Sequence, residues 1–413
     1  MNWKLLKATK LGASTMLSTH AAIAQEAAAG ADEGRAIYLD QMTVTTTRNP
    51  LPAFDAPGMV TVIDRDEIQR VQPSTPDDVL KFVPGVEFTG GPRRTGESPS
   101  IRGFSGADVV VLLDGARQNF GSAHDGRFFI DPELLRSIEV LRGSASSLYG
   151  SGGTGGVMEF KTARAGDFLE PGQTHGARVA AGYQDVNSEE FGSLTAYAQS
   201  EAGIDLIGNV TYRDSGAIDL GGGGQLTNSD DNVISGMLKA GAEVSEDHYV
   251  EASYVSFFNK AEEPNNGQGL GGADAVEKDI SSQTFRLGYT YDNPDDKLLN
   301  LDITAYYNLA KADELRLDNL GNGPAGELLT RDVETIGFRV DNRSAVTLAD
   351  NLASLITYGL EYYRDEQTGE AGGVVRDGVP NAEADTFGAF AQAEFTIDHL
   401  GPIPGELLLI TGA

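Results

Sequence analysis

The chain has 413 residues, longer than one ordinary domain, and no cysteine, so it can form neither disulfides nor thiolate metal sites. Its 31 basic and 61 acidic side chains give a formal charge of −30, which argues against a nucleic-acid partner because the phosphate backbone would be repelled. No apolar run reaches the roughly 18 to 20 residues of a membrane helix, so any membrane span requires a closed β-barrel. The composition, with 51 glycines, suits such a barrel and a soluble acidic β-protein equally well.

Residues 1–25 have the three parts of a secretory signal peptide. Lys4, Lys7 and Lys10 form the basic region, residues 11–17 form a weak apolar region, and Ala22-Ile23-Ala24 provides a small-residue cleavage site. An ordinary amphipathic N-terminal helix is the alternative. Residues 26–49 are predicted to be a linker, and its first part, rich in alanine, glycine and acids, has the composition of a disordered segment.

A run of β-branched residues lies alone between this linker and the Asn49-Pro50 break. Its high β-propensity and unpaired edges suit strand addition to another protein. The alternative is a first strand that pairs inside the next domain. The run consists of Met42, Thr43, Val44, Thr45, Thr46 and Thr47.

Residues 50–165 have the pattern of a small domain of short strands, with glycines where the chain must turn tightly. Apolar runs at 109–113, 138–141 and 157–160 predict three of these strands. Asp64 can cap a short helix, and Thr75-Pro76 begins a second helix that should reach Phe82. Prolines, arginines and glycines at 90–99 predict an exposed loop.

The glycine-rich run at 150–156 is not a nucleotide-binding loop. It lacks the Lys-Ser/Thr pair of such loops and precedes a strand rather than a helix. No nucleophile–base or paired-carboxylate arrangement is evident either, so the chain is not expected to be an enzyme.

After a Gly/Pro linker, strands with alternating apolar and polar residues recur from residue 176 to the end. In 204–213, for example, Ile204, Leu206 and Val210 alternate with polar residues. The strands are about ten residues long, which suits a bilayer crossing better than the five or six residues of soluble strands. About eleven strands are expected, the last at 406–410. Long polar segments at 215–232, 260–278 and 311–329 would be outer loops, and 185–188, 246–247 and 292–296 short turns at the opposite end.

Four motifs occur in an order and spacing that resemble the plug domain of TonB-dependent outer-membrane receptors: IRG at 101–103, LLDGARQ at 112–118, IEVLRG at 138–143 and LYGSGGTGGV at 148–157. Their wording is closest to the haem and haemoglobin receptors. The resemblance covers roughly residues 40–411. It implies a mainly β protein, with an N-terminal α/β plug (50–165) inside a transmembrane antiparallel β-barrel (176–413). Family barrels have about twenty-two strands, so the chain is expected to be an N-terminal fragment or truncated product with a partial barrel.

The resemblance also implies a ligand site in the plug. His124 lies on a glycine-flanked loop at the place of a plug histidine of the haem receptors, before Phe129-Ile130-Asp131-Pro132. An imidazole there can reach an axial position on haem iron, while Phe128 and Phe129 offer ring surface to the porphyrin. An exposed loop histidine without a ligand is the alternative. The second haem histidine of the family would lie beyond residue 413.

Two arginines, Arg102 and Arg142, match plug arginines that pair with barrel glutamates in the family and hold the plug in place. A buried charge requires a partner, and arginine suits bidentate pairing with a carboxylate. Alternation places Glu361 and Glu394 on the lumen side as candidate partners.

The function expected from the resemblance is import of haem across the outer membrane of a Gram-negative bacterium, with haem as transported ligand and no prosthetic group. The periplasmic TonB protein would grip residues 42–47, the TonB box of the family, and displace the plug. The other partners expected are outer-membrane lipid and haem or a haem-carrying protein. A ferric siderophore or other metal chelate as substrate, and a non-transporting fragment, are the alternatives.

Overall fold

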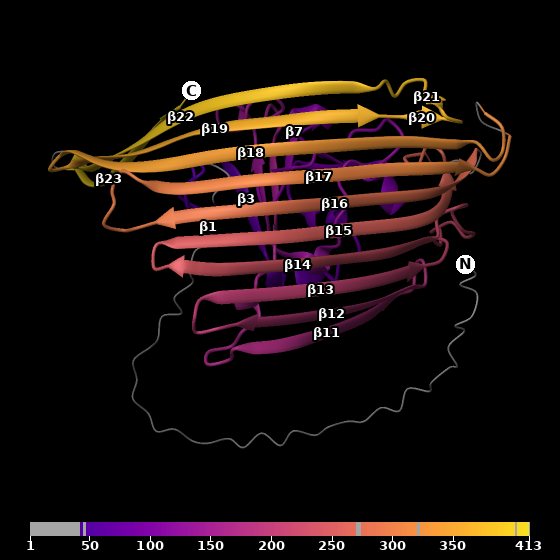
Figure 1. Ribbon diagram of the computed structural model, residues 1–413, viewed down its shortest axis with the longest axis horizontal. Helices are drawn as coiled ribbons and strands as arrows, with labels where there is room; N and C mark the ends of the chain where they lie inside the picture. Colours follow the sequence, from indigo (N-terminus) through magenta and orange to yellow (C-terminus); the bar gives the residue numbers. More distant parts are fainter. Residues whose placement is uncertain (1–41, 44–46, 270–273, 320–322, 401–402, 413) are drawn as a thin grey trace, which may run out of the picture. The chain divides into compact units, whose positions relative to one another are not determined.

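The computed structural model describes residues 42–43, 47–269, 274–319, 323–400 and 403–412 (Figure 1). The predicted signal peptide, most of the predicted linker, and Val44, Thr45 and Thr46 lie outside the described residues. No helix in the described part of the chain is long and apolar enough to cross a membrane.

The N-terminal part contains short strands and helices. They are β1 (Met42–Thr43), β2 (Leu51–Pro52), β3 (Met59–Asp64), α1 (Arg65–Val71), α2 (Pro76–Leu80), β4 (Val86–Thr89), η1 (Arg94–Gly96), β5 (Ser98–Ile101), β6 (Phe104–Ser105), η2 (Gly106–Asp108), β7 (Val109–Leu113), β8 (Ala116–Arg117), η3 (Pro132–Leu134), β9 (Leu135–Arg142), α3 (Ser146–Tyr149), β10 (Gly156–Thr162) and η4 (Ala165–Asp167).

In the second part, the secondary structure of the described residues consists of strands. They are β11 (His175–Gln184), β12 (Glu189–Gln199), β13 (Ile204–Ser215), β14 (Asp231–Ser245), β15 (His248–Pro264), β16 (Ala275–Asp292), β17 (Asn300–Arg316), β18 (Leu328–Ala349), β19 (Leu352–Thr368), β20 (Glu370–Ala371), β21 (Val374–Val375), β22 (Ala382–Leu400) and β23 (Ile403–Gly412).

A five-stranded sheet in the order β3-β9-β10-β7-β8 forms the centre of the N-terminal part. Strand β10 pairs with β7 in parallel and with β9 antiparallel. All five residues of β7 are buried, which explains why this strand is an uninterrupted apolar run. The core includes Ile68, Leu80, Ile138, Met158 and Phe160. The three strands predicted from apolar runs are therefore confirmed.

Both predicted helices of the N-terminal part are present. The Asp64 carboxylate accepts a hydrogen bond from the Glu67 amide at 2.9 Å and caps α1. Helix α2 begins at Pro76 and ends at Leu80, two residues before the predicted end. The two helices bury Ile68, Val79 and Leu80 in the core.

Eleven strands of the second part form one antiparallel path, β11 to β19 followed by β22 and β23, as Figure 1 shows. The predicted number of strands and their alternation are confirmed, but their length is not. Several strands are much longer than ten residues, up to 22 in β18. Residues 260–264 and 275–278, predicted as loop, continue β15 and β16. These extensions carry charged residues on both faces, with the side chains of Lys260 and Glu277 exposed and those of Glu263 and Lys278 buried, and this masks the apolar alternation.

One predicted turn lies at the wrong end of the sheet. The Gly216 amide donates to the Asn187 carbonyl at 2.7 Å, so residues 185–188 lie at the end that carries the loop 216–230. Because antiparallel strands alternate in direction, residues 265–269 and 317–319 share this end, here called the long-loop end. Residues 246–247 and 293–299 lie together at the opposite end, as predicted: the Asp292 amide donates to the Asp247 carbonyl at 3.0 Å.

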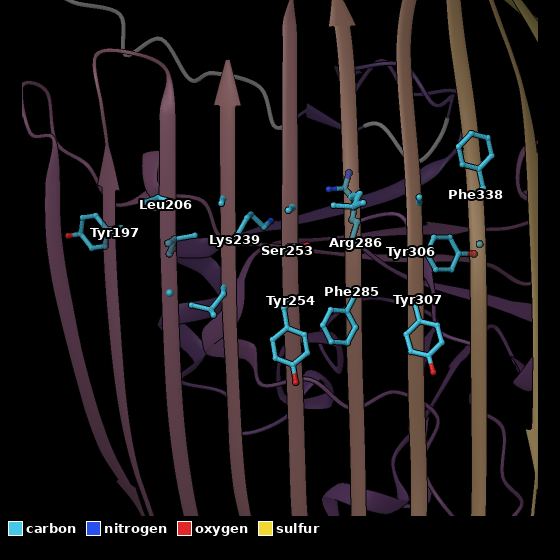
Figure 2. Close-up of a pocket in the computed structure, with 18 of the residues that line it drawn as sticks. Tyr197, Leu206, Lys239, Ser253, Tyr254, Phe285, Arg286, Tyr306, Tyr307 and Phe338 are labelled. Carbon is cyan, nitrogen blue, oxygen red and sulfur yellow. The ribbon is translucent and has the colours of Figure 1, made fainter. Parts of the chain in front are cut away.

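The sheet has two chemically different faces, visible in the side chains of Figure 2. Tyr254, Phe285 and Tyr307 lie side by side in register on one face, with ring centroids 4.5 and 6.5 Å apart. One residue along, Ser253 pairs with both Lys239 and Arg286, and these side chains belong to the other face, which contacts the N-terminal part and is here called the inner face. The exposed apolar face carries Leu206, Leu238, Phe285, Leu287, Ile336, Phe338 and Leu360.

Gly156 is predicted to be indispensable for the small sheet. Its φ is +147°, and a Cβ there would lie 2.1 Å from the Leu141 carbonyl oxygen, which is backbone and cannot move aside. Gly156→Ala should therefore destabilise the N-terminal part by about 1–3 kcal/mol or more. Gly166→Ala is the control, because a Cβ at Gly166 meets nothing within 4 Å. Limited proteolysis in detergent measures the difference, and equal resistance of both variants would contradict the prediction.

Candidate functional site

The loop that carries His124 lies at the long-loop end of the sheet. The His124 carbonyl accepts a hydrogen bond from the Gln268 amide at 3.2 Å, and Gln268 belongs to the loop between β15 and β16. The Gly121 carbonyl accepts one from Arg331 at 2.6 Å, at the same end of β18. His124 is half-buried, and no hydrogen bond or ion pair involves its imidazole within the described ranges. The ring nitrogens thus remain available to a ligand.

The described residues contain no group of three or more side chains of the types that hold a metal ion. His124 therefore has no protein co-ligands in the described part of the chain. A single imidazole can still take an axial position on a metal whose equatorial ligands come with a macrocycle.

Phe128 and Phe129 are packed rather than exposed. The Phe128 ring lies 4.5 Å from that of Phe160 in the core of the small sheet. The Phe129 ring lies 6.0 Å from that of Phe257 on the inner face of the large sheet. Their exposed fractions of 9% and 6% leave little ring surface for a ligand. Their contact with a ligand stays a prediction. In this structure the two rings pack in the cores and hold the C-terminal end of the histidine loop.

The segment 90–99 is not the exposed loop that its prolines and arginines predicted. Arg93 is 2% exposed and donates to the carbonyls of Thr227 and Asn228, each at 2.7 Å, and of Gly269. These carbonyls belong to two separate loops at the long-loop end. No local pattern in the sequence indicates this role, because all three partners lie more than a hundred residues away in the chain.

Arg94, the next residue, also binds the large sheet. Its guanidinium pairs with Glu189 at 2.7 Å and with Asp231 at 2.8 Å, one at the start of β12 and the other at the start of β14. In a neighbouring pair the arginine belongs to the large sheet and the carboxylate to the N-terminal part: Arg213 of β13 makes a bidentate contact with Asp131, at 2.7 and 3.0 Å. Charged groups of both parts thus interlock at this end of the sheet.

The predicted partners of Arg102 and Arg142 are corrected by the structure. Glu361 and Glu394 do lie buried on the inner face, but Glu361 binds Arg117 at 2.8 Å and Glu394 accepts from Asn49. Arg142 donates to the Pro84 carbonyl and the Thr61 hydroxyl, each at 2.9 Å, and Arg102 contacts Met59. Both arginines are thus held within the small domain. Alternation could assign a glutamate to the inner face but not its partner, since partners depend on how the two parts dock.

The described residues of the segment 42–47 pair internally. Met42 and Thr43 form a short antiparallel pair with β2, and the Thr43 hydroxyl donates to Glu139 at 2.7 Å. Directly after this segment, Arg48 is 3% exposed and binds Asp341 at 3.0 Å, with the rings of Tyr149 and Phe390 each 4.5 Å from its guanidinium carbon. Internal pairing, the alternative raised by the sequence, is thus present at these two residues.

Glu97 is predicted to make the stability of the N-terminal part depend on pH. Burial, reinforced by nearby Asp77, raises the pKa of Glu97 to about 8. Its unfolded pKa is about 4.3, so its stabilising effect is complete below that pH and is lost as pH rises through about 8. The free energy of unfolding should fall over this window, and Glu97→Gln should make the fall smaller.

Glu87→Gln is the matched control, because Glu87 is exposed on β4. Thermal unfolding in detergent at several pH values between about 5 and 9 measures the dependence. A Glu97→Gln variant that retains the wild-type pH profile would show that another group is responsible.

Comparison with known proteins assigns both parts of the chain. The family model "TonB-dependent Receptor Plug Domain" matches residues 52–157, and "TonB dependent receptor-like, beta-barrel" matches residues 211–406. The "Hemin receptor" of Yersinia pestis is 32% identical over 87% of this chain and 52% of its own length. "Heme/hemopexin utilization protein C" of Haemophilus influenzae is 27% identical over 97% of this chain and 59% of its own length. The chain thus spans about half the length of the curated relatives it matches.

Solved structures show the same fold. The Serratia marcescens hemophore receptor HasR, solved as a double mutant with its hemophore HasA and heme, superposes with a TM-score of 0.73 at 22% identity. This superposition covers 84% of this chain and 50% of HasR. The FrpB iron transporter of Neisseria meningitidis (F3-3 variant) gives 0.71 at 19% identity, covering 86% and 57%. With a plug domain docked on the inner face of an antiparallel barrel sheet, the chain belongs to the family of TonB-dependent outer-membrane receptors.

Proposed function

We propose that the protein takes part in haem import, with His124 binding the haem iron at the outer face. The observation that carries this proposal is the relationship to proteins named hemin and heme receptors, at 27–32% identity over 87–97% of the chain. Neighbouring solved structures share only the fold and do not bear on the substrate. The position of His124 among the loops of the long-loop end is compatible with capture from outside.

The chain's own residues would present the imidazole and hold the loop that carries it. Haem supplies the iron and the equatorial porphyrin ligands, so one protein imidazole suffices on one side of the ring. Gly121 and Gly126 flank the loop, and buried Phe128 and Phe129 anchor its C-terminal end in two packed cores. A loop fixed at its end and open at its histidine is suited to meet a flat ligand.

Energy would come from a periplasmic TonB protein that pairs with residues 42–47. A β-branched strand adds to a partner sheet through backbone hydrogen bonds, so the pairing of Met42 and Thr43 with β2 would have to open before TonB could bind there. Arg102 and Arg142 remain proposed as part of the plug–barrel lock. Burial, and next the proximity of Arg102, lower the pKa of Arg142, and neither arginine has a carboxylate partner within the described residues. Two adjacent unpaired cations favour carboxylates on a facing surface.

Replacing His124 tests haem binding directly. Titration of the purified chain in detergent with haem should produce a Soret band distinct from that of free haem. His124→Ala should abolish or shift this band, because the axial imidazole is removed. His175→Ala is the control, since His175 is exposed at the start of β11. No distinct band for the wild-type chain, or binding of a ferric siderophore instead, would refute the proposal.

A proline within the TonB box tests the proposed pairing of TonB with residues 42–47. Thr45→Pro removes one backbone donor from the strand and should abolish capture by the periplasmic domain of TonB. Ala27→Pro, in the preceding linker, should leave capture unchanged. Retention of the Thr45→Pro variant at wild-type affinity would argue that the protein–protein contact lies elsewhere.

A further inference from the structure

Asp125, the neighbour of His124, is bound to the inner face of the large sheet. Its carboxylate accepts a hydrogen bond from Lys278 of β16 at 2.6 Å. The Lys278 side chain is 0% exposed and the Asp125 side chain 5% exposed. A charge-assisted hydrogen bond of this length between buried groups fixes the two parts of the protein relative to each other at this point.

The main chain of His124 is held from two sides. On the plug side, the Ser122 hydroxyl oxygen accepts from the amides of His124 and Asp125, each at 3.1 Å. On the barrel side, one residue of the β15–β16 loop makes two contacts: the Gln268 amide donates to the His124 carbonyl at 3.2 Å, and its side chain to the Asp125 carbonyl at 2.7 Å. The direction in which the imidazole points therefore depends on groups of the barrel.

Gly126, the residue after Asp125, is fixed by close backbone contacts. Gly126 approaches Thr95 and Glu97 so closely that a Cβ would lie 2.5 Å from the Glu97 carbonyl oxygen. The Thr95 hydroxyl in turn donates to Glu263 of β15. Asp125 and Gly126 are thus enclosed between the segment 90–99 and the inner face, while His124 is half-buried. A shift of the plug moves the loop away from both Gln268 and Lys278.

Lys278 is surrounded by more acid than it can neutralise. Asp125, Glu263 and Glu314 lie 2.6, 3.6 and 3.4 Å from its ammonium group, and Arg376 binds Glu314 at 2.8 Å. If all three carboxylates are ionised, they face two cations. The cluster therefore retains two carboxylates for two cations when Asp125 becomes an amide, so this substitution does not leave a buried lysine unpaired.

We infer that Lys278 and Gln268 are positioning residues for His124, so that the axial ligand is aligned only while the plug is docked. Lys278 acts through Asp125, and Gln268 acts both through Asp125 and directly on the His124 carbonyl. This inference rests on the proposed function. Displacing the plug separates Asp125 from Lys278 and His124 from Gln268 in one movement. The same step that opens the path thereby loosens the ligand, because the imidazole loses the contacts that direct it.

Asp125→Asn tests the inference in the 413-residue chain in detergent, with haem as the probe. Asparagine still offers Lys278 an acceptor oxygen but no longer an ion pair, and this weaker contact should lower the haem affinity about tenfold and shift the Soret band toward that of His124→Ala. Asp125→Glu, which keeps the charge, should recover part of the affinity. Asp279→Asn is the matched control, because Asp279 follows Lys278 in the chain but its side chain is 54% exposed and pairs with Lys260.

The outcomes separate this inference from the proposed function. If the wild-type chain shows no His124-dependent haem spectrum, the function itself fails. If it does, and Asp125→Asn binds haem with wild-type affinity and spectrum, the positioning role is wrong while the function stands. Should Asp125→Asn unfold at a lower temperature than the control, Gln268→Ala decides instead: a spectrum shifted toward His124→Ala supports the inference, and an unchanged spectrum overturns it.

Discussion

Buried ion pairs between the plug and the inner face of the barrel sheet are the interaction on which the structure depends. Arg117 with Glu361, Arg48 with Asp341 and Arg213 with Asp131 are each nearly excluded from solvent. Removing such charges from water costs almost as much as their attraction returns, so the pairs add little net stability when complete. Removing one partner of such a pair is costly while the other stays buried, because an uncompensated charge is then left without water. A plug held in this way is therefore fixed in one position, yet both surfaces can be hydrated again when it leaves.

Apolar contacts between plug and sheet are confined to patches. Phe120 and Phe129 pack against Phe257 and Val233, and Met237 and Val255 extend the plug core. Elsewhere the inner face presents charged and hydroxyl groups, while the same strands present leucine and aromatic side chains on the opposite face (Figure 2). The two-residue period of a strand makes this division possible, because each neighbour in the chain serves a different environment.

The candidate ligand site combines both parts of the protein. The plug contributes His124, but loops and strand ends of the barrel hold the histidine loop, through Gln268, Lys278 and Arg331. Arg93 binds the carbonyls of two loops at the long-loop end. Neither part alone would have this arrangement. A ligand that binds His124 in this arrangement would stabilise the docked plug, so its affinity and the docking of the plug would be coupled.

The sequence by itself determined the features that depend on neighbouring residues. The apolar run of β7, the capped helix after Asp64 and the alternation of the barrel strands all follow from local periodicity and turn chemistry, and the plug motifs identified the family. Only the tertiary structure decided the partners of the charges and the burial of the segment 90–99. Asn49 and Glu394 are 345 residues apart, and Arg117 and Glu361 are 244 apart. Such pairs depend on the register of every strand between them and on how the plug docks, and no local pattern encodes either.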